Sequence, residues 1–275
     1  MKGGLTLKKL IIAFVITLVV ATTAITSADA VSVRVGSTEV KKDDVIFVNS
    51  TTYVPLRTVS NLLCPEATVS WSDGQAIINA PLVSITSRPG DLFIQANGRC
   101  LYAVDGVKLL GSRTFVPVRT LAKAFGASVT WDSASQKAIV TKGSGTISSG
   151  DQYYNSDDVY WLSRIINAES SGESMLGKIA VGDVILNRVA SPDYPNTIYD
   201  VIFDTKYGVQ FEPTVNGTIY QTPSSDSVIA AKLCLDGASV VGSCQYFFNP
   251  VTASSSWISQ NCTYYCTIGN HDFYA

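Results

Sequence analysis

Residues 166–173 (INAESSGE), followed by residues 177–189 (GKIAVGDVILNRV), decide the fold of the second half of this 275-residue chain. Apolar residues at helical spacing lead into the first stretch and fill the second, so the pattern predicts two helices joined by a turn. Glu169 and Glu173 lie four residues apart, at the end of the first helix and the start of the next. This pair of carboxylates is the best candidate for chemistry in the chain.

Further helical patterns lie before and after this pair of glutamates in the sequence. Residues 156–158 (SDD) supply an N-cap and an acidic first turn for the first helix. The second helix is expected at about 175–189, and a third at 225–235, where Gly237 ends it. The aromatic residues from 246 onward predict short strands and loops that close a pocket. The C-terminal domain is therefore expected to be mainly α with a small β portion. The buried stripe of its first helix is Val159, Leu162, Ile165 and Ile166.

An internal repeat fills residues 31–142. The sequence TYVPLRT at 52–58 recurs as TFVPVRT at 114–120, and VSW at 69–71 recurs as VTW at 129–131. Each copy closes on an apolar strand, at 76–78 and at 138–140. Pro55 and Pro117 stand where a short helix can begin, because a missing N–H costs nothing in the first turn. The N-terminal domain is therefore expected to be α+β, with two similar units sharing one core.

The repeated VPxR motif, its helix and the VxW strand resemble the copper amine oxidase N-terminal-like domain, a stalk module. This region has no histidine, so copper binding in it is unsupported. The resemblance implies a non-catalytic spacer or wall-facing module. Arg57 and Arg119 are candidates for contacts with acidic glycan or protein groups, although arginines beside a helix start are more often structural.

Composition divides the chain into four segments. Residues 1–30 read as a signal peptide, because Lys2, Lys8 and Lys9 precede a short apolar run and small residues supply a cleavage point after Ala30. No stable membrane anchor is expected after cleavage, and the protein is expected to be secreted. Residues 143–152 have the composition of a flexible linker, and they separate the stalk domain at 31–142 from a second domain at 153–275.

Charge and cysteine content restrict the partners and the redox state. Removal of residues 1–30 leaves 17 basic and 21 acidic residues, a net charge of −4. Nucleic acid is therefore not an expected partner, because binding it requires clustered Lys and Arg. A neutral or acidic polymer outside the cell, such as a glycan, is the expected partner. An even set of six cysteines in an exported chain predicts disulfides within each half, with the pairing left open. These are Cys64 and Cys100, then Cys234, Cys244, Cys262 and Cys266.

Glu169 has two reasons to remain protonated near neutral pH. The negative pole of the helix dipole disfavours its ionisation, and Glu173 adds a like charge nearby, so both effects raise its pKa. A protonated carboxyl is what cleavage of a glycosidic bond requires. The alternative is that Glu169 and Glu173 have no catalytic role and are solvated residues at a helix terminus.

The helix-turn-helix pattern resembles the SleB-type cell-wall hydrolases, the family of the spore cortex-lytic enzymes, from about Tyr160 to the end of the chain. The motifs that carry this resemblance are YPNT at 194–197, GVQF at 208–211, YFFNP at 246–250 and IGNHDF at 268–273, together with Asn187-Arg188. The resemblance implies a lysozyme/transglycosylase-like fold and a catalytic acid at Glu169. It also implies a supporting role for Glu173. The supporting or substrate-binding candidates are Gln210, Phe211, Tyr246, Phe248, Asn249 and His271.

The resemblance further implies a lytic transglycosylase acting on peptidoglycan glycan strands, in spore cortex or vegetative wall turnover. It also implies that the secreted protein is located in the cell wall or spore envelope. A hydrolytic muramidase is the alternative, and it would need Glu173 or Glu212 to position a water. A non-catalytic wall-binding protein is the alternative from another class. With one histidine in the chain, neither a metal nor any other cofactor is expected. The sequence is silent on protein partners and on oligomeric state.

Overall fold

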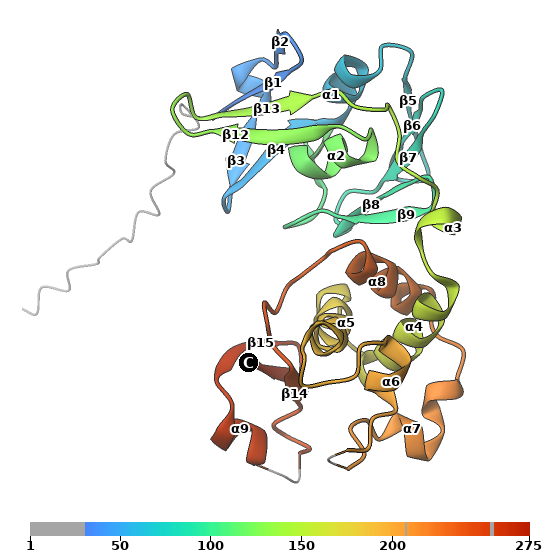
Figure 1. Ribbon diagram of the computed structural model, residues 1–275. Helices are drawn as coiled ribbons and strands as arrows, with labels where there is room; N and C mark the ends of the chain where they lie inside the picture. The colour runs from blue at the N-terminus through green and yellow to red at the C-terminus, as the bar shows by residue number, and fades with distance from the viewer. Residues whose placement is uncertain (1–30, 207, 254–255) are drawn as a thin grey trace, which may run out of the picture.

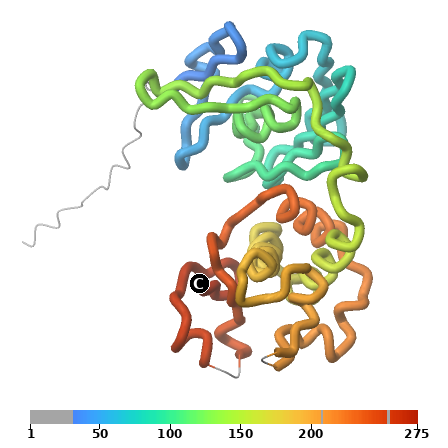
Figure 2. The backbone as a smooth tube through the Cα atoms, in the orientation of Figure 1, coloured from blue at the N-terminus to red at the C-terminus, as the bar shows by residue number. Residues whose placement is uncertain are grey.

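The computed structural model describes residues 31–206, 208–253 and 256–275, so the signal peptide expected at 1–30 lies outside the described residues. The chain forms an N-terminal β-rich domain and a C-terminal helical domain, joined at a narrow waist (Figures 1 and 2). The predicted fold class is confirmed in both parts. Within the described ranges, no helix is long and apolar enough to cross a membrane.

The two copies of the repeat have the same order of elements. In the first, strand β4 (Thr51–Pro55) leads into α1 (Leu56–Leu63) and the hairpin of β5 (Thr68–Ser72) and β6 (Gln75–Asn79). In the second, β11 (Arg113–Pro117) leads into α2 (Val118–Ala124) and the hairpin of β12 (Ser128–Asp132) and β13 (Lys137–Thr141). Pro55 and Pro117 occupy the N-cap positions of the two helices, at the point where each strand becomes a helix.

Pairing between the copies builds one core. Strands β4 and β11 are antiparallel neighbours, with Val54 opposite Val116, at the centre of the sheet β10 (Lys108–Leu110), β11, β4 and β3 (Ile46–Val48). The chain closes on itself where β1 (Ser32–Val35) pairs in parallel with β13, next to β2 (Thr38–Glu39), while η1 (Lys42–Asp44) precedes β3. The first hairpin is extended to β5-β6-β7-β8-β9 by β7 (Ser84–Ser87), β8 (Phe93–Ala96) and β9 (Arg99–Tyr102).

The C-terminal domain packs three long helices against one another: α4 (Ser156–Ser170), α5 (Met175–Ala190) and α8 (Ser225–Leu235). Gly182 of α5 lets them approach, because a Cβ there would lie 2.6 Å from Cys234 Sγ and 3.0 Å from Ile166 Cδ1. Asn155 rather than Ser156 caps α4, since its side chain accepts hydrogen bonds from the amides of Asp157 and Asp158 at 2.8 and 3.3 Å.

Short elements complete this domain. Helices α6 (Ile198–Ile202) and α7 (Pro213–Asn216) and the turn η2 (Thr218–Tyr220) lie between α5 and α8 in the chain. After α8 come β14 (Tyr246–Phe248), α9 (Trp257–Asn261), β15 (Tyr264–Ile268) and β16 (His271–Tyr274). The three strands form a sheet in the order β14-β16-β15, which is the small β portion predicted.

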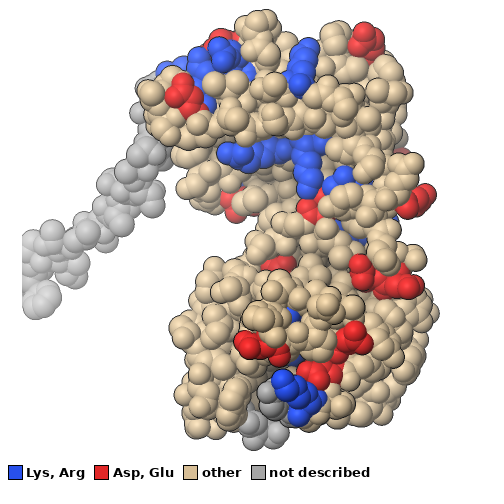
Figure 3. All heavy atoms as spheres, viewed as in Figure 1, with Lys and Arg blue, Asp and Glu red and all other residues tan. Residues whose placement is uncertain are grey.

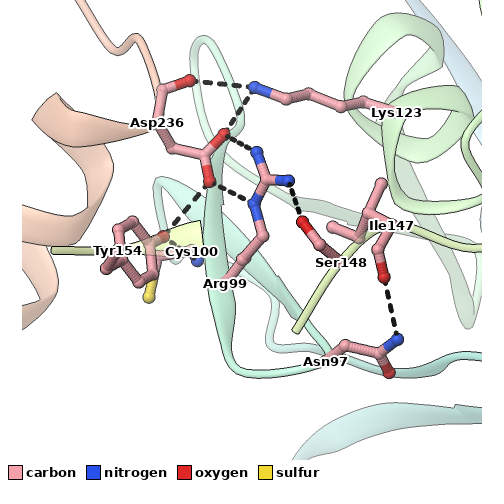
Figure 4. Close-up of polar contacts among 8 residues, drawn as sticks. All are labelled: Asn97, Arg99, Cys100, Lys123, Ile147, Ser148, Tyr154 and Asp236. Carbon is pink, nitrogen blue, oxygen red and sulfur yellow. Dashed lines mark hydrogen bonds and ion pairs between the residues drawn. The ribbon is translucent and has the colours of Figure 1, made fainter. Parts of the chain in front are cut away.

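Strand β9 belongs to the cores of both domains. Leu101 packs into the N-terminal core, whereas Cys100 joins the core of the helical domain, because successive side chains of a strand point to opposite faces. Beside it, Asp236 at the end of α8 accepts hydrogen bonds from Arg99 and from Lys123 of α2 (Figure 4). The two domains therefore share a packed, hydrogen-bonded interface.

Residues 143–152 are tied to the N-terminal domain, where composition predicted a flexible linker. Asn97 donates to Thr146 Oγ1 at 3.0 Å and to the Ile147 carbonyl at 3.3 Å, and the Gly150 amide donates to the Asn97 carbonyl at 2.8 Å. The segment then forms α3 (Gly150–Tyr153), whose Tyr153 ring stacks on Arg99. A Gly- and Ser-rich segment is ordered here because side chains of the domain satisfy its backbone groups.

The predicted disulfides are wrong in this structure, where all six cysteines are free. Cys64 packs against the N-terminal core, whereas Cys100 lies in the core of the helical domain, so the two thiols occupy different hydrophobic clusters. Burial raises the pKa of Cys100 and of Cys244 to about 11. These thiols remain protonated at neutral pH and unreactive.

Candidate active site

Glu169 lies in the last turn of α4, on a helix end that its neighbours hold in place. Asn167 Oδ1 accepts hydrogen bonds from the Ser224 amide at 3.0 Å and from Ser227 Oγ at 3.2 Å, which tie this turn to the start of α8. Ser170 Oγ donates to the Ile166 carbonyl at 2.6 Å. The Glu169 carboxyl is therefore positioned by a fixed backbone.

Burial, aided by the like charge of the Glu212 carboxylate, raises the pKa of Glu169 from 4.5 to about 7. The protonated form is therefore well populated near neutral pH, as the sequence predicted. The predicted cause is wrong: desolvation, not the helix dipole, is the largest effect, and Glu212 rather than Glu173 is the nearby carboxylate.

Glu212 reaches Glu169 from a separate segment. It occupies the N-cap position of α7 and is exposed, between Phe211 and Pro213, which are both buried. These two buried neighbours anchor the segment, and its carboxylate is near enough to act on Glu169 as a like charge. Sequence spacing contains no signal for this interaction, and Glu212 was foreseen only as one option for positioning a water.

Glu173 has a structural environment instead. Asn270 Nδ2 donates to Glu173 Oε1 at 2.7 Å and the Asn270 amide donates to Oε2 at 3.3 Å, while the Glu173 side chain is only 8% exposed. A Cβ on Gly269 would lie 1.7 Å from Glu173 Oε2. Glu173 therefore fastens the turn after α4 to the turn between β15 and β16, and only glycine at 269 leaves room for it.

His271, at the start of β16, faces the same carboxylate. Its Nδ1 lies 3.9 Å from Glu173 Oε1, and its ring meets Phe247 edge to face with centroids 5.4 Å apart. Burial lowers the pKa of His271 below its usual value, and Glu173 only partly opposes this effect. The imidazole is therefore neutral at pH 7 and serves as part of the pocket wall.

Arg188, buried in α5, connects the GVQF and YFFNP segments. Its Nε donates to the Gln245 carbonyl at 2.8 Å, and its Nη1 lies 3.4 Å from Gln210 Oε1, where it donates a long hydrogen bond. The guanidinium also lies over the rings of Phe211 and Tyr246, at 5.2 and 5.5 Å. Neighbouring Asn187 donates to the carbonyls of Gly242 and Cys244, both at 2.8 Å.

The aromatic candidates divide between core and surface. Phe211 is 3% exposed and packs near Phe247, so it belongs to the core. Tyr246 and Phe248 alternate with Phe247 along β14 and are half-buried; Tyr246 lies near Trp257, and Phe248 stacks on Tyr274. Asn249 Oδ1 accepts from the Val251 amide at 2.9 Å, which makes it a turn residue. Tyr246 and Trp257 are thus the accessible aromatic pair, and Trp257 was not foreseen.

In the described part of the chain, no three His, Cys, Asp or Glu side chains are placed to hold a metal ion. A protonated Glu169 beside an exposed carboxylate can donate a proton and later accept one.

Comparison with known proteins identifies both domains. Residues 172–274 match the Cell Wall Hydrolase family model, and residues 34–140 match the Copper amine oxidase N-terminal domain. The C-terminal domain thus matches the cell wall hydrolase family over most of its length, and the predicted resemblance of both domains is confirmed. Glu173 lies inside the matched region and Glu169 just before it.

Within that family, the chain is similar to the spore cortex-lytic enzymes. It is 39% identical over 105 residues to that of Bacillus cereus (38% of this chain, 39% of the relative) and 33% identical over 105 residues to that of Bacillus subtilis strain 168 (38% and 33%). The chain thus spans about two fifths, or less, of these relatives. The solved catalytic domain of the germination-specific lytic transglycosylase SleB from Bacillus anthracis is 36% identical, with 47% of this chain and 100% of that chain covered and a TM-score of 0.42.

Proposed function

We propose that this chain is an exported enzyme that cleaves peptidoglycan between N-acetylmuramic acid and N-acetylglucosamine, as a lytic transglycosylase. One observation carries the proposal: Glu169 is a half-buried carboxyl with a pKa of about 7 at the end of α4. The names of the relatives support the substrate class. The domain plan proposed with it assigns residues 31–142 to a wall-facing module and residues 153–275 to the catalytic part.

Glu169 acts twice in this mechanism. Its carboxyl first donates a proton to the glycosidic oxygen, the bond from that oxygen to the anomeric carbon breaks, and positive charge develops on the muramic sugar. The resulting Glu169 carboxylate then accepts the proton of the sugar's own primary hydroxyl as that oxygen bonds to the anomeric carbon. The product ends in an anhydro ring, and no water is consumed.

Glu212 has an electrostatic role in this proposal. Its carboxylate keeps the proton on Glu169 before reaction, and it stabilises the positive charge that develops on the sugar. Glu173 has no such role, because Asn270 engages both of its oxygens. Tyr246 and Trp257 are the aromatic surfaces proposed to stack on sugar rings.

A hydrolytic muramidase is the second candidate, and the electrostatic interaction between Glu212 and Glu169 is the observation that favours it. Glu212 is exposed and acts on the acid as a second carboxylate, so it is the candidate to orient a water toward the anomeric carbon.

Mass analysis of the muropeptides tests both reaction types. The transglycosylase predicts anhydro products that borohydride does not change. If the products instead have reducing ends that carry oxygen from isotopically labelled water, the enzyme is a hydrolase and the transglycosylase mechanism is excluded. Comparison of cortex peptidoglycan with vegetative sacculi shows which wall is the better substrate. Loss of cleavage in Glu169→Gln, but not in the distant, exposed Glu66→Gln, assigns the activity to this site.

A further inference from the structure

A groove of about 440 Å³ crosses the N-terminal domain, between the hairpin β12–β13 of the second repeat and strands β3 and β4 of the first. In Figure 1 these elements lie away from β8 and β9, which border the C-terminal domain. The groove is thus separate from the site around Glu169. The residues used below to argue its chemistry are Phe47, Ser50, Thr52, Arg119 and Trp131.

Two aromatic rings are exposed along this groove. Trp131 is 39% exposed on β12, on the same face as Val129, which packs against the core. The residue opposite Trp131 is Ala138, whose small side chain leaves space beside the indole ring. Phe47, in the middle of β3, is 43% exposed on the other side of the groove. Large rings left in water at a concave surface indicate a binding site for flat apolar faces.

The polar groups of the groove favour a negatively charged ligand. Arg119 carries the only formal charge among the described lining residues. Its Nη1 donates to the Val129 carbonyl at 3.1 Å, which holds the guanidinium along β12. Ser50 and Thr52 add hydroxyls. Figure 3 shows Lys and Arg side chains along the side of the N-terminal domain that borders the waist.

We propose that this groove binds a glycan strand that bears carboxylates, as a non-catalytic second site for the cell-wall polymer. Trp131 and Phe47 stack on the C–H faces of sugar rings, Arg119 pairs with a carboxylate of the muramic acid substituent, and the hydroxyls bond sugar oxygens. The identity of the polymer rests on the proposed function. Because the Asp236 interface joins the domains, both sites engage one insoluble polymer and raise each other's effective affinity.

The first repeat supplies a matched control. Trp71, on β5, is the repeat equivalent of Trp131 and lies opposite Ala76 of β6. It is 52% exposed, yet it does not line this groove. Replacing Trp71 by Ala removes an exposed indole of the same kind without changing the site. Both variants alter exposed side chains, so both are expected to fold.

Co-sedimentation with purified peptidoglycan tests the proposal, in the full chain with Glu169→Gln so that the polymer stays intact. Trp131→Ala and Arg119→Gln are expected to weaken binding by about tenfold each, while Trp71→Ala stays within about twofold. The parent protein is expected to bind peptidoglycan with amidated carboxyls as weakly as the Arg119→Gln variant binds unmodified peptidoglycan. Equal binding by Trp131→Ala and its parent, or equal losses at Trp71 and Trp131, would overturn the proposal.

Two further readouts separate this proposal from the proposed function. Without the Glu169 change, Trp131→Ala is expected to cleave short soluble glycan fragments at the parental rate and insoluble sacculi more slowly. If the protein cleaves no glycan, the proposed function fails, but the co-sedimentation results still show whether the groove binds peptidoglycan. Sedimentation velocity of the protein alone distinguishes another occupant, since dimers lost only in Trp131→Ala would show that a second copy of the chain fills the groove.

Discussion

Both carboxylate oxygens of Asp236 accept hydrogen bonds from Arg99 across the domain interface, with Nε and Nη2 each 2.8 Å away. Both residues are buried, at 7% and 6% exposure, and Lys123 Nζ and Tyr154 Oη also contact the carboxylate. Burial opposes its ionisation, but the bonds from Arg99 and Lys123 outweigh that effect and lower the pKa of Asp236. The interface therefore depends on a fully paired buried charge.

Asp236→Ala is expected to lower the free energy of unfolding by about 3–5 kcal/mol, because it leaves the Arg99 guanidinium buried without its partner. The surface pair of Asp44 and Arg113 provides the control, since Asp44→Ala is expected to cost less than about 1 kcal/mol. Urea unfolding of both variants measures the difference. Equal costs would show that the interface ion pair contributes no more than a surface pair.

Glu169→Gln is expected to reduce glycan cleavage by about 100-fold or more, because the amide keeps the size of the side chain but cannot donate the proton. The free energy of unfolding is not expected to fall. Initial rates on soluble glycan, with Glu66→Gln as control, provide the measurement. Wild-type rates in Glu169→Gln would remove this residue from the mechanism.

The activity is expected to decline as the pH rises through about 7, because Glu169 must be protonated to act as the acid. Glu212→Gln removes a like charge, so it lowers the pKa of Glu169 and moves the alkaline limb of the rate profile to lower pH. Rates of wild type and Glu212→Gln from pH 4 to 9 check the shift. An unmoved limb would mean that Glu212 does not act on Glu169.

Stability is expected to depend on pH with a defined sign. The pKa of Glu169 is higher in the folded than in the unfolded chain, so the native state binds more protons between pH 4.5 and about 7. The free energy of unfolding therefore falls as the pH rises through that window. Urea unfolding at several pH values compares wild type with Glu169→Gln, in which this contribution should be missing.

Gly269→Ala is expected to destabilise the protein and reduce cleavage. The new Cβ would collide with Glu173 Oε2 at 1.7 Å, and the residue has φ +60°. Gly111 is the control, since its φ is +53° and a Cβ there meets nothing within 4 Å. Gly111→Ala should cost about 1 kcal/mol of backbone strain, and Gly269→Ala clearly more. Equal costs in thermal unfolding would show that Glu173 moves away freely.

Reductant is expected to leave the urea midpoint unchanged, because all six cysteines are free thiols. In the native protein, a maleimide should label the half-buried Cys64, Cys262 and Cys266 before the buried Cys100, Cys234 and Cys244. Mass spectrometry of the labelled peptides gives the order. A midpoint that drops with dithiothreitol would show that the oxidised protein contains a disulfide.

The helices were predictable because their signal is local. Residues 225–235 form α8 with the bounds that the pattern indicated, and Gly237 ends it with φ +96°. The repeat was predictable by comparing the chain with itself. The cap of α4 was misassigned by one residue, because Asn155 and Ser156 both have side chains suited to an N-cap.

Patterns in the sequence were enough to predict the two-domain α+β and α architecture, the repeat and Glu169 as the candidate acid. The surroundings of the key side chains depend on the folded arrangement, which brings the charge of Glu212 to act on Glu169, Asn270 onto Glu173 and Arg99 onto Asp236. Helical periodicity can be recognised because it is a property of one segment. A raised pKa or a buried ion pair depends on which distant segment covers that residue and removes its water.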